Sequence, residues 1–100
     1  MDVNKFKPRL GISTNDTGFD EEILAHAEDA LNELAIYVGV TKLTDEDQAL
    51  PSVWQFSLAY VIKMFRGDSM TQNAINDLNL RMQNASINFS VEYFNDHKQV

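Results

Sequence analysis

The stretch PSVWQFSLAYVIKMFR, Pro51–Arg66, decides the fold of this 100-residue chain. Proline suits the first position of a helix, where its missing N–H leaves no bond unmade. Apolar side chains then cover most of the helix circumference. A helix that is apolar nearly all round must be covered on more than one side. The sequence therefore predicts that two or three helices of the same chain, or another subunit, surround this segment. Its expected packing residues, in the core or between subunits, are Trp54, Leu58, Val61 and Phe65.

A second helix is predicted upstream, over Phe19–Val38. Thr17 is a suitable N-cap, and the acidic residues of the first turn favour the positive end of the helix dipole. Gly39 follows the last apolar residue, where a left-handed conformation often ends a helix. The apolar stripe of this helix comprises Phe19, Ile23, Ala27, Ala30, Leu31, Leu34 and Val38.

Shorter patterns flank these two helices. Val3–Leu10 has helical spacing, but Pro8 limits it to a short or irregular turn, since proline lacks the donor that a continuing helix needs. Thr44–Gln48 is a polar connector with room for one helical turn. Ser69–Gln72 has the form of a capping box and predicts the start of a further helix, whose apolar face comprises Met70, Ala74, Leu78 and Met82.

The C-terminal segment has a different period. Ile87, Phe89, Val91 and Tyr93 alternate with polar residues, which indicates a strand. Since no second strand is evident and a lone strand leaves its backbone unpaired, this segment is either a frayed or self-paired tail or a strand that adds to a partner. We expect these four residues to bind the partner.

These patterns define the expected fold class. It is mostly α, a small bundle of three to four helices with a C-terminal extended or β-strand tail. Residues 1–85 form the helical domain, and residues 86–100 form the extended arm.

Composition excludes several functions. The chain has 15 acidic and 8 basic residues, a formal net charge of −7, and no cysteine. Disulfides, thiolate nucleophiles and cysteine-based zinc sites are therefore excluded. A negative surface repels phosphate backbones and anionic membranes, and no stretch approaches the roughly 20 apolar residues of a membrane span. We expect a soluble intracellular protein.

No catalytic pattern is evident. His26 and His97 are far apart, and neither belongs to a nucleophile or metalloprotease motif. Glu22 and His26 share a helix face but are more consistent with a solvated charge pair than with a metal site. We predict no catalytic, cofactor-binding or metal-binding residue and rank an enzyme last.

The order of these features resembles the small head–tail connector (adaptor) proteins of tailed bacteriophages. The resemblance covers Lys5–Gly67: a short element ending in Arg9-Leu10-Gly11-Ile12, an acidic turn, a helix ending in Tyr37-Val38-Gly39, and a proline-started apolar helix ending in Met64-Phe65-Arg66-Gly67.

The resemblance implies a virion protein at the head–tail interface, assembled in the host cytoplasm. Such subunits form a ring, expected to be dodecameric, on the portal protein, and they present a surface to the next head-completion (stopper) or tail protein. Double-stranded DNA would pass through the ring without specific binding. The acidic residues that could face this channel are Asp20, Glu21, Glu22, Asp45, Glu46 and Asp47.

An alternative from another class is a small acidic binding module. It would act as an inhibitor or DNA mimic in the basic groove of a nucleic-acid-binding protein. That function needs carboxylates at phosphate-like intervals, whereas the clearest clusters here lie at helix starts.

Overall fold

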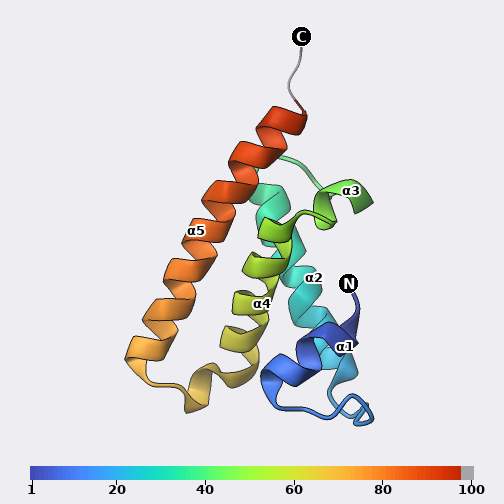
Figure 1. The fold of residues 1–100 in the computed structure, drawn as a ribbon, viewed down its shortest axis with the longest axis vertical. Coiled ribbons are helices and arrows are strands. Elements are labelled where there is room, and N and C mark those ends of the chain that lie inside the picture. The colour runs from blue at the N-terminus through green and yellow to red at the C-terminus, as the bar shows by residue number, and fades with distance from the viewer. Residues whose placement is uncertain (98–100) are drawn as a thin grey trace.

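The computed structural model describes residues 1–97 as a bundle built around one central helix (Figure 1). The elements, in chain order, are α1 (Val3–Phe6), a 3₁₀ turn (Lys7–Leu10), α2 (Asp20–Tyr37), α3 (Asp45–Gln48), α4 (Pro51–Arg66), a second 3₁₀ turn (Gly67–Ser69) and α5 (Gln72–Asp96). The prediction of a mostly α fold is confirmed, and no strand occurs among the described residues.

The central helix is α4, and other parts of the same chain surround it. α2 packs along one side, α5 along another, and the N-terminal segment, residues 1–12, packs on a further side between Trp54 and Phe65 (Figure 1). Val53, Ser57 and Val61 of α4 are fully buried. The sequence allowed two sources of cover for this apolar helix, the same chain or another subunit. Helices of the same chain therefore provide most of the cover.

Two apolar clusters form the core. The first joins α2, α4 and α5, and it comprises Ala30, Leu34, Ala35, Val38, Leu43, Val53, Phe56, Ala85, Phe89 and Tyr93. The second joins the N-terminal segment to α2 and α4, and it comprises Phe6, Leu10, Ile12, Ile23, Ala27 and Val61. Each cluster needs α4, so both depend on the placement of this helix.

The N-terminal segment is fixed by a buried cation. Lys7 is almost fully buried, and its Nζ lies 2.7 Å from Oδ1 of Asp20 and donates to the carbonyl oxygen of Thr14. The guanidinium of Arg66 also donates to the carbonyl oxygen of Leu10, which ties the end of α4 to the same segment. Because a buried charge requires a partner, Lys7 fixes the loop before α2 as well as its first turn.

Glycines end two elements, at Gly39 as expected and at Gly11, but two predicted caps are wrong. Gly11 and Gly39 have positive φ angles of 73° and 81°, the left-handed conformation that glycine adopts without strain. Phe19 rather than Thr17 precedes α2, with no capping side chain. The N-cap of α5 is Thr71, which accepts from the backbone N–H of Ala74.

Two further details of the capping prediction differ. Ser69 lies in the 3₁₀ turn and donates to the carbonyl oxygen of Arg66, so Ser69–Gln72 is not a capping box. A reciprocal capping box occurs instead at the start of α3, between Thr44 and Asp47. The connector Thr44–Gln48 does contain the expected helical turn.

The predicted strand at Ile87–Tyr93 is wrong. These residues continue α5 as an unbroken helix to Asp96. Phe89 and Tyr93 are four residues apart and face the core with Ala85, whereas Ile87 and Val91 lie on the opposite face. Apolar residues on both faces of a helix produce local alternation, which explains the misreading.

The expected boundary between residues 85 and 86 therefore falls inside α5. Residues 86–96 are helical and contribute Phe89 and Tyr93 to the core, so they are not an extended arm. The last three residues of that predicted arm, 98–100, lie outside the described residues.

The helical placement of this segment makes a direct prediction. Phe89→Ala should lower the free energy of unfolding by about 3–5 kcal/mol because it leaves a cavity in the core. Val91→Ala, on the exposed face, should change it by less than about 1 kcal/mol. Urea unfolding followed by circular dichroism measures both. Equal losses for the two variants would contradict the helix and favour a strand with both residues on one face.

Candidate protein-binding surface

The outward face of α5 carries a row of exposed apolar side chains, here called the outer ridge: Leu80, Ile87, Val91 and Phe94. Their exposed fractions are 55%, 46%, 57% and 57%. The spacings of seven, four and three residues place all four on one side of a helix, opposite the buried side that holds Leu78, Ala85 and Phe89. α5 is thus apolar on two opposite faces, of which the bundle covers one.

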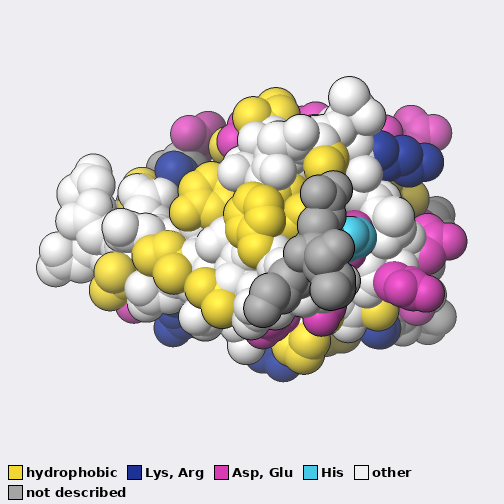
Figure 2. All heavy atoms as spheres, turned by 90° about the horizontal axis from the view of Figure 1, so that it is seen from above, with side chains coloured by type: hydrophobic (Ala, Val, Ile, Leu, Met, Phe, Trp, Pro, Cys, Tyr) yellow, Lys and Arg dark blue, Asp and Glu magenta, His cyan; other side chains and the backbone are white. Residues whose placement is uncertain are grey.

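The outer ridge is also free of charge. α5 has 25 residues, of which only Asp77, Arg81, Glu92 and Asp96 are charged. None belongs to the ridge, whose neighbours along the helix are largely Asn and Gln. In Figure 2, hydrophobic side chains are exposed on the side of the molecule where α5 lies, and several Asp and Glu side chains lie toward the opposite edge. An exposed apolar row on a monomer commonly marks a protein interface.

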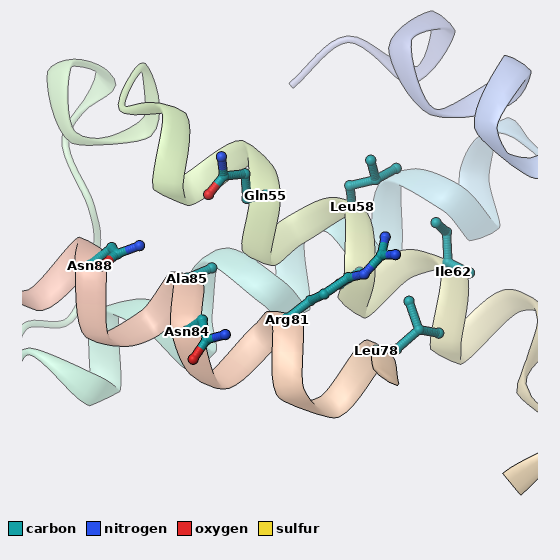
Figure 3. Close-up of a pocket in the computed structure, with 9 residues that line it drawn as sticks. Gln55, Leu58, Ile62, Leu78, Arg81, Asn84, Ala85 and Asn88 are labelled. Atoms are coloured by element: carbon teal, nitrogen blue, oxygen red, sulfur yellow. The ribbon is translucent and has the colours of Figure 1, made fainter. Parts of the chain in front are cut away.

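A groove runs beside the ridge, between α4 and α5 (Figure 3). This α4–α5 groove has a volume of about 250 Å³. Its floor is apolar and comprises Leu58, Ala59, Ile62, Leu78 and Ala85, and its polar edge comprises Gln55, Arg81, Asn84 and Asn88. Figure 3 shows the Arg81 side chain extending from α5 toward α4. An apolar floor with a polar edge is the usual construction of a site that receives another side chain or helix.

Arg81 is the one charged residue that lines the groove. Its Nε lies 2.9 Å from Oδ2 of Asp77, one helical turn earlier. Both side chains are exposed, so this pair contributes little to stability. It does compensate the positive charge locally, which leaves the groove without net charge.

Polar contacts hold the C-terminal half of α5 against the bundle. The hydroxyl of Ser52 at the start of α4 donates to Oε2 of Glu92 over 3.1 Å. Nε2 of His97 lies 3.0 Å from Oδ1 of Asp47 in α3, and the His97 ring stacks on Tyr93 with centroids 4.2 Å apart. These contacts fix the rotation of α5 and therefore the direction in which the outer ridge points.

Asp47 is the centre of this anchor. Burial would raise the pKa of its carboxyl group, but the hydrogen bonds with the His97 ring and with Thr44 outweigh burial and hold the pKa below its usual value. The ionised carboxylate thus caps α3 and holds the end of α5 at the same time.

The structure separates the four residues predicted to bind a partner. Ile87 and Val91 are on the outer ridge, whereas Phe89 and Tyr93 are in the core and cannot contact a partner in this conformation. Leu80 and Phe94 were missed, although they continue the row of Ile87 and Val91 at helical spacing.

The four predicted packing residues have different surroundings. Val61 is in the core, Trp54 packs on Phe6 with ring centroids 4.9 Å apart, and Phe65 meets Phe19 edge to face at 5.4 Å. Leu58 is half-buried, packs against the second cluster and also lines the α4–α5 groove. All four thus belong to the second cluster or pack on it, and Leu58 alone also borders the groove.

The six acidic residues predicted to face a channel also divide into two groups. Asp20 is paired with Lys7, and Asp47 is buried, so both have structural roles. The other four are exposed: Glu21, Glu22, Asp45 and Glu46.

Residues 1–97 contain no group of His, Asp or Glu side chains with the geometry of a metal site. No helix of this part of the chain is long and apolar enough to cross a membrane. Comparison with family models, curated proteins and solved structures finds no match to this chain.

The role of Asp47 predicts a pH dependence. Because the folded-state pKa is lowered, the ionised carboxylate stabilises the fold above its ordinary pKa of about 3.9, and this contribution disappears as the pH falls through the folded value. Asp47→Asn should therefore lower the free energy of unfolding by about 1–2 kcal/mol at pH 7 and by much less at pH values below the folded-state pKa of Asp47. Asp45→Asn, which alters an exposed neighbour, is the control. A deficit for Asp47→Asn that does not change with pH would contradict this role.

Proposed function

We propose that this chain is a structural subunit of a tailed bacteriophage, a head–tail connector that forms a ring on the portal. The observation that carries the proposal is the outer ridge of α5, four large apolar side chains in a row that the bundle leaves uncovered. A chain of this size does not gain from exposing such a row to water, so a protein contact is its best physical explanation. The resemblance of Lys5–Gly67 to connector proteins supports this kind of assembly.

The distribution of charge suits this function. A ring that extends the channel must let double-stranded DNA slide without gripping it, and contacts from Lys and Arg to phosphates are what grip DNA. The exposed acidic residues Glu21, Glu22, Asp45 and Glu46 would repel phosphates instead. The expected partners are the portal protein above the ring and the next head-completion or tail protein below it.

The acidic binding module is a second candidate, and α2 favours it more than the sequence suggested. Six acidic and no basic residues lie along α2, and those exposed continue past the first turn to Glu28, Asp29 and Glu33. A DNA mimic would compete with DNA for a basic protein in a salt-dependent manner. Failure to displace DNA from any DNA-binding protein encoded in the same genome would remove this candidate.

The connector function predicts binding to a portal. The pure chain should co-sediment with rings of the portal protein encoded in the same genome, at one chain per portal subunit. The measurement is analytical ultracentrifugation of the chain with and without the rings. Repetition at about 0.5 M salt separates specific docking from charge attraction, because salt screens exposed charges. Portal rings whose sedimentation does not change in the presence of the chain would contradict the function.

A further inference from the structure

The outer ridge and the α4–α5 groove lie on neighbouring sides of α5 and are complementary in form. The ridge is convex and apolar, and it extends from Leu80 to Phe94, about 21 Å at the helical rise. The groove is concave with an apolar floor, and it extends along α5 from Leu78 to Asn88, about 15 Å. Within the described chain, no segment fills the groove or covers the ridge.

We propose that the outer ridge of one copy inserts into the α4–α5 groove of the next copy. This inference rests on the proposed function and deepens it, because it names the contact from which the ring is built. Ile87 and Val91 occupy the middle of the ridge and are the side chains that enter the groove, over Leu58 and Ile62 of the neighbour.

The charge distribution favours these two surfaces over others for a contact between two copies. Each chain carries a net charge of −7, so two copies repel through most of their surfaces. The ridge has no charged residue, and the groove has only Arg81, which is paired within its own chain to Asp77. These two surfaces can meet without bringing acidic groups of the two chains together.

The size of the contact sets its strength. Half-exposed side chains of this kind each expose on the order of 100 Å², so the ridge offers about 400 Å² of apolar surface. A stable interface buries about 800 Å² on each partner. The contact is therefore weak for a pair of free chains, and a ring or a portal platform strengthens it by joining many such contacts.

The symmetry of the contact follows from its two different surfaces. When a surface binds a different surface on the next copy, the free ridge and free groove at the two ends remain available. Repetition then generates a closed ring or an open filament when each groove receives the ridge of a further copy, whereas two copies that exchange their ridges reciprocally would close a two-fold dimer. A contact between two outer ridges would instead stop at the dimer.

Two variants remove one surface each. Ile87→Glu/Val91→Glu places charges on the ridge, and Gln55→Glu/Asn88→Asp places carboxylates at the edge of the groove with almost no change in shape. All four positions are exposed, so the fold should be retained, which circular dichroism checks. Leu24→Glu/Ala25→Glu adds the same charge at exposed positions of α2 and is the matched control.

Sedimentation equilibrium tests the contact at chain concentrations up to about 1 mM, the range in which weak contacts are measurable. The average mass of the native chain and of the control should rise with concentration. Each ridge or groove variant alone should remain monomeric. An equimolar mixture of the two variants should form a 1:1 dimer and nothing larger, because one intact ridge meets one intact groove.

Three results would overturn the proposal. They are a native chain that stays monomeric over this range, a mixture of the two variants that stays monomeric, and a groove variant that still dimerises alone, which would indicate ridge-to-ridge pairing.

Portal binding is measured separately. If the chain self-associates through both surfaces but does not bind the portal, the connector function alone is refuted. If the chain binds the portal and the ridge and groove variants assemble as the native chain does, this contact alone is refuted.

Discussion

The coverage of α4 is the constraint on which the rest of the structure depends. Its apolar side chains point in nearly all directions, so three separate parts of the chain must pack on it. α2 and the N-terminal segment cover two sides of α4, and the ion pair of Lys7 with Asp20 holds the N-terminal segment in place. α5 covers the third with Leu78, Ala85 and Phe89. Because these residues fix one face of α5 against α4, the opposite face is left uncovered, and the outer ridge is a consequence of the core.

The sequence correctly predicted the helix with a single apolar stripe, α2, and the helix that is apolar nearly all round, α4. α2 was placed within one residue at each end, and α4 has the predicted bounds. α5 was misread in its second half because its apolar residues face two opposite directions. Ala85, Phe89 and Tyr93 form one row, Ile87 and Val91 belong to the other, and these five residues together alternate as a strand does. Only the position of α4 reveals that the first row is the buried one.

Caps and the candidate surface were harder to predict for a different reason. Several residues near each helix start can cap it, and tertiary contacts select among them. Thr71 caps α5 because Ser69 is used by the turn that follows α4. The groove requires two helices to be placed side by side, and Leu58 and Leu78 come from different helices. No pattern within either helix contains that information, whereas Ile87 and Val91 could be selected as exposed binding residues from the sequence alone.

The separation of charge from apolar surface links the fold to the proposed assembly. Most acidic residues lie on α2 and α3, where all but Asp20 and Asp47 are exposed to water, while the outward face of α5 is neutral. In a chain with a net charge of −7, repulsion acts wherever the acidic faces approach. Copies can therefore approach most closely through α5 and the neighbouring side of α4. The polar contacts of Asp47 and Glu92 that hold α5 in place thus affect more than stability, because they determine the direction in which the outer ridge points.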